Sequence, residues 1–153
     1  IYTLSLHDAL PISSLELSLE PIQKNLNDVA GIRVICSFID DIYKVARMLA
    51  RQDDITVIRV KDYIKNPKPN GYRSYHMILE TPIFFSDEKV SMRVEVQIRT
   101  VAMDYWASLE HRMKYKQDIE NADEIMAALK ECADTIAATD LKMMEIREKI
   151  PRK

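Results

Sequence analysis

The clearest pattern in the chain is a strict alternation of apolar and polar residues over 90–100. Because successive side chains of a strand point to opposite faces, this alternation predicts a strand with one buried face. Shorter apolar runs over 29–38, 55–64 and 74–85 are rich in β-branched residues and predict three further strands. The polar face of the 90–100 strand holds Ser91, Arg93, Glu95, Gln97 and Arg99.

Apolar residues at helical spacing predict three helices, over about 39–51, 101–116 and 121–150. Only the first helix connects two strands, and the other strands follow one another directly. This order predicts an α+β fold, in which a mixed β-sheet is flanked by helices and a long helix ends the chain.

Capping and breaker residues mark the ends of these elements. Ser37 with Asp40, and Asn121 with Glu124, are spaced as capping pairs for the first and the last helix. Pro82 within the third strand has no N–H to donate, so that part of the strand is expected at an edge of the sheet or at its own end.

The last helix carries a second pattern, a 4–3 spacing that predicts a stripe along one side. At ~1.5 Å per residue this helix is ~45 Å long, which is more than a small domain needs for its own core. Two interpretations stay open: the stripe packs within its own chain, or it forms a seam with a second chain. The stripe consists of Ile125, Leu129, Cys132, Ile136, Thr139, Met143, Ile146 and Ile150.

The composition narrows the class of protein. A length of 153 residues, 47% of them apolar and 30% charged, is typical of one soluble globular domain. The net charge of −2 argues against a nucleic-acid partner, and no apolar run approaches the ~18 residues of a membrane span. Gly31 and Gly71 are the only glycines, which excludes a dinucleotide-binding fingerprint and a Walker loop. The two cysteines and three histidines lack the spacing of zinc motifs or of a disulfide framework.

Residues suited to a flat, phosphorylated ligand gather in 61–76 (KDYIKNPKPNGYRSYH). Lysines and Arg73 are interleaved there with tyrosines, and cations neutralise phosphates while aromatic rings stack on bases. Two prolines restrict the backbone before a ligand arrives, and Gly71 can adopt a positive φ. The alternative is an ordinary basic surface loop.

Two carboxylates indicate a metal site. Glu95 lies on the polar face of the fourth strand. The alternative interpretation of this face is an ordinary solvated surface. Asp28 comes just ahead of the first strand, where Asp is also a common turn residue. If the two strands are neighbours, these carboxylates and the phosphate oxygens of a ligand can hold Mg²⁺.

Three segments together, 28–33 (DVAGIR), 61–76 and 95–100 (EVQIRT), resemble the synthetase domain of the RelA/SpoT-type alarmone synthetases. The resemblance covers roughly residues 14–150, extends to 106–116 (WASLEHRMKYK) and is closest to the small, single-domain members. It implies a fold related to nucleotidyltransferases. It also implies a GTP pyrophosphokinase, which moves the β,γ-diphosphate of ATP to the ribose 3′-hydroxyl of GDP or GTP and yields AMP and ppGpp or pppGpp.

The resemblance implies roles for individual positions. Asp28 and Glu95 match the family's Mg²⁺ ligands, and Glu95 also matches the proposed general base. Tyr72 matches the ring that stacks on guanine. On the ATP side, Lys61 matches a basic residue near the phosphates and Arg33 matches one of two arginines around the adenine. Further contacts to the acceptor nucleotide match Lys68, Asn70, His76, Gln97 and the backbone of Ala107.

One family motif has no counterpart in this sequence. In the family, a basic ATP-binding stretch of the form R-x-K-x-x-x-S precedes the DVAGIR strand, whereas Lys24 is the only Lys or Arg before that strand here. Residues 4–13 look like translated adapter sequence, so 1–13 are expected to be non-native. We therefore expect a catalytic core over 14–120 that is incomplete at its N-terminus, and a packing or oligomerisation helix over 121–153.

The family also implies partners and a location. The expected substrates are ATP and GDP or GTP, and the expected assembly is a cytoplasmic homo-oligomer, typically a tetramer, that involves helix 121–150. The alternative is a catalytically inactive fragment that binds guanine nucleotides or oligomerises. A nucleic-acid binder that uses the 61–73 cations is a third interpretation, against which the net charge argues.

Overall fold

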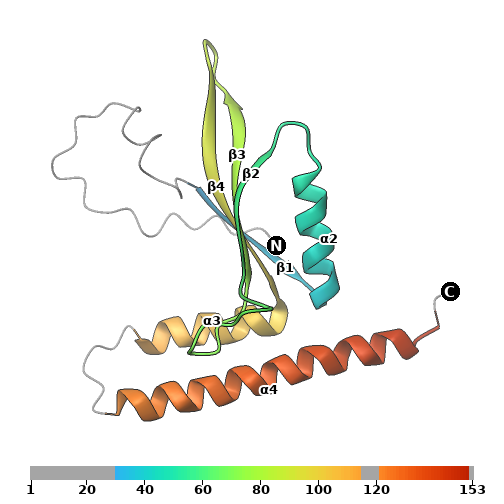
Figure 1. Cartoon of the computed structure of the whole chain (residues 1–153), viewed down its shortest axis with the longest axis vertical. Helices are drawn as coiled ribbons and strands as arrows, with labels where there is room; N and C mark the ends of the chain where they lie inside the picture. Colours follow the sequence, from blue (N-terminus) through green and yellow to red (C-terminus); the bar gives the residue numbers. More distant parts are fainter. Residues whose placement is uncertain (1–29, 115–120, 152–153) are drawn as a thin grey trace.

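A computed structural model describes residues 30–114 and 121–151 of the chain (Figure 1). Both the predicted order of elements and the predicted α+β class are confirmed, with bounds that differ by a few residues. The elements are β1 (Ala30–Cys36), α2 (Ile39–Ala50), β2 (Thr56–Asp62), β3 (Tyr75–Phe84), β4 (Lys89–Thr100), α3 (Val101–Lys114) and α4 (Ala122–Lys149).

The strands form one mixed sheet in the order β1-β4-β3-β2. β1 runs parallel to β4, while β4 with β3 and β3 with β2 are antiparallel. Pairing between β2 and β3 ends at Glu80, so Pro82 lies where β4 is the only strand neighbour of β3 in the described part of the chain. The edge position expected for this proline is therefore confirmed.

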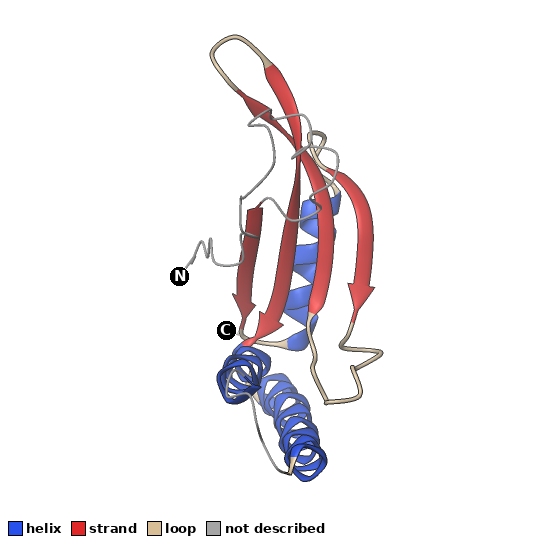
Figure 2. Cartoon of the chain, turned by 90° about the vertical axis from the view of Figure 1, so that its left-hand side faces the viewer, coloured by secondary structure: helices blue, strands red, loops and turns tan. Residues whose placement is uncertain are grey.

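α2 covers one face of the sheet (Figure 2). Its apolar side is fully packed there, with Ile42 0% and Ala46 4% exposed. The apolar face predicted for β4 supplies the other half of this core. Its residues Val94, Val96 and Ile98 are buried in one cluster with the apolar residues of α2. The polar residues of β4 consequently lie on the opposite face of the sheet.

α3 and α4 lie across one end of the sheet, as both views show (Figures 1 and 2). They enclose a second apolar cluster of Trp106, Ala107, Leu129 and Ala133. The indole Nε1 of Trp106 donates to the carbonyl of Leu129 at 2.9 Å, which fixes α3 against α4. Among the described residues, no helix is long and apolar enough to cross a membrane.

Neither predicted capping pair makes its side-chain hydrogen bond. The N-terminal cap of α2 is Phe38, in extended conformation, and Asn121 caps α4 without a side-chain bond. Asp40 instead pairs with Lys44 at 2.7 Å and with Arg147 of α4 at 2.9 Å. Hydrogen bonds from Arg147 and Lys44 lower the pKa of Asp40 to about 2. The acidic first turn of α2 therefore ties this helix to α4.

The stripe predicted along α4 is covered only in part. In its first half Ile125, Leu129 and Ile136 pack inside the domain, whereas Cys132 is exposed. The inward face then continues through Ala133 and Asp140, which are not stripe positions. Met143, Ile146 and Ile150 remain 50%, 44% and 62% exposed. A helix with 3.6 residues per turn drifts away from a strict 3.5-residue repeat, so the straight helix buries a different set of residues than the repeat predicts.

Candidate active site

Strand register brings candidate residues from all four strands into one row. Gln97 of β4 lies opposite Arg33 of β1 on one side and opposite His76 of β3 on the other. Lys61 of β2 lies opposite His76 and completes the row. Glu95 stands one alternation step along β4, on the same face. This face is opposite the one that α2 covers.

The Glu95 carboxylate makes hydrogen bonds to two other candidate site residues, His76 and Gln97. Its Oε1 lies 2.9 Å from His76 Nδ1, and its Oε2 accepts from Gln97 Nε2 at 3.2 Å. The hydrogen bond from His76 lowers the pKa of Glu95, with help from Gln97 and from the charge of Lys61, against the opposing effect of burial. With 27% of its side chain exposed, Glu95 is an ionised carboxylate that faces solvent.

The segment between β2 and β3 folds back as an ordered loop. Gly71 adopts a φ of +88°, a backbone conformation that suits glycine. The side-chain oxygen of Asn70 accepts from the Tyr72 N–H at 3.1 Å, and its amide donates to Glu110 of α3 at 3.0 Å. Arg73 reaches away from Glu95 and donates to the Ala133 carbonyl of α4 at 3.1 Å. α3 and α4 therefore set the position of this loop.

Tyr72 is partly buried at the rim of the second apolar cluster. Its ring lies edge-on to Tyr63 and His76, with centroids 5.9 Å away in each case. Lys68 places its ammonium 4.8 Å from the centroid of the Tyr72 ring. Because Lys68 itself is exposed and flexible, a ligand base can take its place over the ring.

Arg99 and Asp104 also belong to this site, although we predicted no role for either from the sequence. Arg99 is 5% exposed and donates to the Tyr72 hydroxyl at 2.7 Å and to Gln97 Oε1 at 2.8 Å. Asp104 accepts from Arg99 at 3.1 Å and pairs with Arg33 at 3.4 Å. The alternation along β4 placed Arg99 on the correct face of the sheet. It could not predict that Arg99 is buried, because burial depends on contacts with other elements.

Of the remaining candidates, Lys61 and Ala107 lie outside this hydrogen-bonded group, and Arg33 reaches it through its ion pair with Asp104. Lys61 is exposed at the β2 edge, and the Arg33 side chain is 47% exposed. Ala107 is 7% exposed inside the α3–α4 cluster, away from the row of polar side chains. Asp28 lies outside the described residues, so its predicted metal role stays a prediction.

The surroundings of Glu95 fit a cation. Gly31 is paired with Glu95 across the β1–β4 ladder, and a Cβ at Gly31 would meet no atom of the described residues within 4 Å. Open space beside an ionised carboxylate is what Mg²⁺ with its waters requires. Among the described residues, no three His, Cys, Asp or Glu side chains form a metal-binding group by themselves. Further ligands would have to come from Asp28 and from substrate phosphates.

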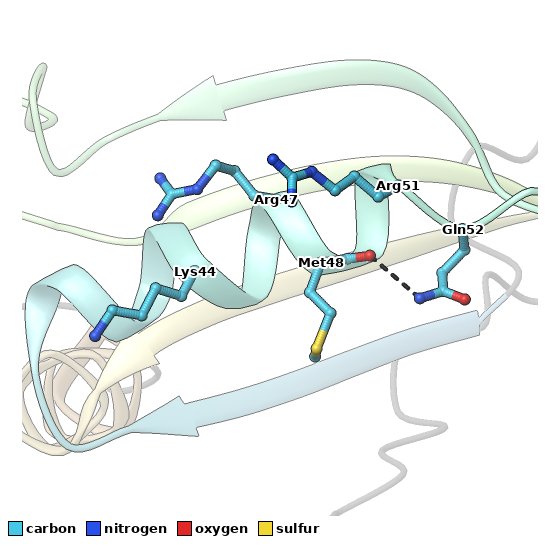
Figure 3. Close-up of a pocket in the computed structure, with 5 residues that line it drawn as sticks. All are labelled: Lys44, Arg47, Met48, Arg51 and Gln52. Atoms are coloured by element: carbon cyan, nitrogen blue, oxygen red, sulfur yellow. Dashed lines mark hydrogen bonds between the residues drawn. The ribbon is translucent and has the colours of Figure 1, made fainter.

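A separate hollow of about 420 Å³ runs along α2 (Figure 3). Lys44, Arg47, Met48, Arg51 and Gln52 line it, all from this helix and its C-terminal end. Lys44 is occupied by Asp40 and Asp41, at 2.7 and 2.8 Å. Because α2 covers the face opposite Glu95, this hollow is not part of the polar row.

Comparison with known proteins identifies the family. A family model described as a region found in RelA/SpoT proteins matches residues 13–120. The chain belongs to the RelA/SpoT family. It is 42% identical over 135 residues to the GTP pyrophosphokinase YwaC of Bacillus subtilis (strain 168), covering 88% of this chain and 64% of the relative. It is 36% identical over 127 residues to the GTP pyrophosphokinase YjbM of the same strain, covering 83% and 60%. The chain thus spans less than two thirds of either relative.

Solved structures of RelA/SpoT-family proteins share the fold. Small alarmone synthetase 2 from Bacillus subtilis superimposes with a TM-score of 0.79 at 44% identity, covering 83% of this chain and 70% of that chain. Small alarmone synthetase 1 from the same organism, bound to its product pppGpp, gives a TM-score of 0.76 at 36% identity, with 86% and 67% covered. The predicted mixed sheet with its long C-terminal helix is therefore confirmed as the fold of this family.

Proposed function

We propose that this chain carries the synthetase site of a GTP pyrophosphokinase. The reaction would transfer the β,γ-diphosphate of ATP to the ribose 3′-hydroxyl of GDP or GTP. The observation that carries the proposal is the ionised Glu95 carboxylate, held by His76 and Gln97 on an open polar face beside the Tyr72 ring. The similarity to two relatives that are named GTP pyrophosphokinases supports it.

In this proposal Glu95 acts on the acceptor hydroxyl. The 3′-oxygen attacks the β-phosphorus of ATP while its proton moves to a Glu95 carboxylate oxygen. The bond from the β-phosphorus to the oxygen that bridges it to the α-phosphorus breaks, and AMP leaves with that oxygen. Glu95 and Asp28 would hold Mg²⁺, which when bound offsets the charge of the transferred group.

The loop and β3 would position the acceptor nucleotide. Guanine would stack on Tyr72, displacing Lys68 toward the phosphates, and such stacks contribute ~1–3 kcal/mol per base. Asn70, His76, Gln97 and the Ala107 backbone are the further contacts that the family resemblance implies. On the donor side, Arg33 would lie against adenine and Lys61 near the phosphates.

The direct test is a transfer assay with the chain after residues matching the R-x-K-x-x-x-S stretch are joined ahead of it, since the sequence lacks that ATP-binding stretch. Incubation with ATP, GDP and MgCl₂, followed by anion-exchange chromatography, is expected to yield AMP and ppGpp in equal amounts. GTP in place of GDP should yield pppGpp. Binding of GDP by this extended chain without any product would refute the transfer reaction.

Replacing Tyr72 with Ala is expected to weaken GDP binding by about 10- to 100-fold, because the stacking surface is lost. Isothermal titration calorimetry measures this loss. Tyr63→Ala is the matched control, since it removes a neighbouring tyrosine to which no stacking role is assigned. Equal losses in the two variants would contradict the role given to Tyr72.

A second candidate function is an assembly module without transfer activity. The exposed apolar side chains at the end of α4, which include Met143, Ile146 and Ile150, support self-association. Light scattering coupled to size-exclusion chromatography distinguishes the two functions when combined with the transfer assay. An oligomer that binds GDP and makes no product would favour the assembly module.

A further inference from the structure

Arg99 is one member of a closed ring of side-chain hydrogen bonds in the site. The ring runs from Arg99 to Tyr72, on to His76 and Glu95, and back through Gln97 to Arg99. We infer that Arg99 is a positioning residue that orients both oxygens of the Glu95 carboxylate through two hydrogen-bonded arms. The inference rests on the function proposed for Glu95 and adds a residue to which no role has been given.

The guanidinium sets the direction of the first arm. Arginine can only donate, so the Tyr72 oxygen accepts from Arg99 at 2.7 Å and its own hydrogen is free for the next partner. That partner is His76 Nε2 at 2.9 Å, which accepts when the imidazole is neutral. In the neutral imidazole the proton then sits on Nδ1, which donates to Glu95 Oε1 at 2.9 Å.

The second arm starts from the same nitrogen of Arg99. Its Nη2 donates to Gln97 Oε1 at 2.8 Å, which turns the amide nitrogen of Gln97 toward Glu95. That nitrogen donates to Glu95 Oε2 at 3.2 Å. Because a carboxylate can only accept and a guanidinium can only donate, the ring with a neutral His76 has a single consistent direction. Both oxygens of Glu95 are held from one buried cation.

Arg99 is itself fixed in place. Its Nε donates to Ser74, which is 0% exposed, at 3.3 Å, and its Nη1 donates to Asp104 at 3.1 Å. The guanidinium also lies 5.2 Å from the Tyr72 ring centroid. A lysine ammonium keeps the charge but cannot reach the four acceptors in the plane that the guanidinium fork defines. Arg99→Lys therefore separates positioning from charge.

The first readout is the imidazole of His76 in the full chain without nucleotides. Two-bond ¹H–¹⁵N correlation spectra, assigned by the signals lost in His76→Gln, are expected to show the proton on Nδ1 and a hydrogen-bonded acceptor at Nε2. Tyr72→Phe removes the donor to Nε2 and keeps the ring, so the Nε2 resonance should move toward the value of an acceptor without a partner. Arg99→Lys should move it the same way, and Arg93→Lys, on the same strand, should leave it in place.

The second readout is kinetic. Arg99→Lys is expected to lower kcat by about 100-fold, the size of effect that small misplacements of catalytic groups produce. Tyr72→Phe should lower kcat about tenfold for the lost hydrogen bond, with the KM for GDP within about twofold because stacking persists. Arg93→Lys should change kcat by less than about twofold, as expected for a surface pair. A merely structural Arg99 would lower the melting temperature and leave the kcat of the folded fraction unchanged.

Two results would overturn the inference. One is a His76 proton on Nε2 in the unaltered chain. The other is a folded Arg99→Lys variant with an unchanged Nε2 resonance and unchanged kcat. The two proposals can fail separately. If the chain makes no ppGpp but shows the expected His76 tautomer and the expected resonance shifts, the proposed function is contradicted and the hydrogen-bonded ring around Glu95 is supported.

Discussion

Replacement of Glu95 with Gln is expected to lower diphosphate transfer by about 10²–10⁴-fold, the usual contribution of a general base. The amide has nearly the shape of the carboxylate, so the position beside His76 and Gln97 stays filled. It carries no negative charge for a cation, and it cannot accept the proton of a ribose hydroxyl. Both roles proposed for Glu95 are therefore lost in one substitution.

Guanine-nucleotide binding should survive this substitution, because Tyr72 and Lys68 are untouched. Single-turnover assays with ATP and GDP measure the chemical step, and calorimetry with GDP measures binding. Glu80→Gln is the matched control, since Glu80 lies on neighbouring β3, is part of a surface pair with Arg93 at 3.8 Å, and has no assigned role. Near-normal turnover in Glu95→Gln would show that Glu95 is neither base nor metal ligand.

Much of this site is predictable from local sequence patterns. The alternation along β4 placed Glu95, Gln97 and Arg99 on one face because side-chain direction in a strand depends on nothing beyond the strand itself. The loop at 66–71 was likewise predictable from its prolines and Gly71, since turn chemistry acts over a few residues. Local rules therefore placed these residues on one face or in one loop, whereas the roles expected of them came from the family resemblance.

Partnerships across the fold were not predictable in this way. His76 meets Glu95 only because β3 and β4 pair in one register, and Arg73 faces α4 through Ala133, 60 positions away along the chain. The capping pair predicted for α2 was wrong for a similar reason, because Asp40 pairs with Arg147 of α4. In these cases contacts between elements decided where the side chains lie.

Those tertiary contacts link the loop between β2 and β3 to α4, and Gly71 of this loop lies close against the helix. A Cβ at Gly71 would lie 2.5 Å from the Ala133 Cβ and 3.4 Å from the Lys130 Cα. The φ of +88° adds a second penalty for any other residue. Gly71→Ala is expected to lower the free energy of unfolding by about 2–5 kcal/mol, from about 1–2 kcal/mol for the backbone and about 1–3 kcal/mol for the overlap.

Urea denaturation measures this loss, and two controls separate its parts. Gly31→Ala changes the other glycine of the chain, where a methyl group meets nothing in the described part of the chain within 4 Å, and should cost no more than about 1 kcal/mol. Ala133→Gly relieves the overlap and leaves the backbone penalty. The Gly71→Ala/Ala133→Gly double variant should therefore be more stable than the sum of its single changes predicts, by about the 1–3 kcal/mol of the overlap.

GDP affinity should fall in parallel in Gly71→Ala, because Tyr72 follows directly in the chain and its ring packs at the rim of the α3–α4 cluster. Partial recovery of GDP affinity in the double variant would establish that α4 supports the loop between β2 and β3, since Ala133 lies on α4 and no nucleotide contact is assigned to it. Strict additivity of the two substitutions, in stability and in affinity, would contradict the close approach of Gly71 to α4.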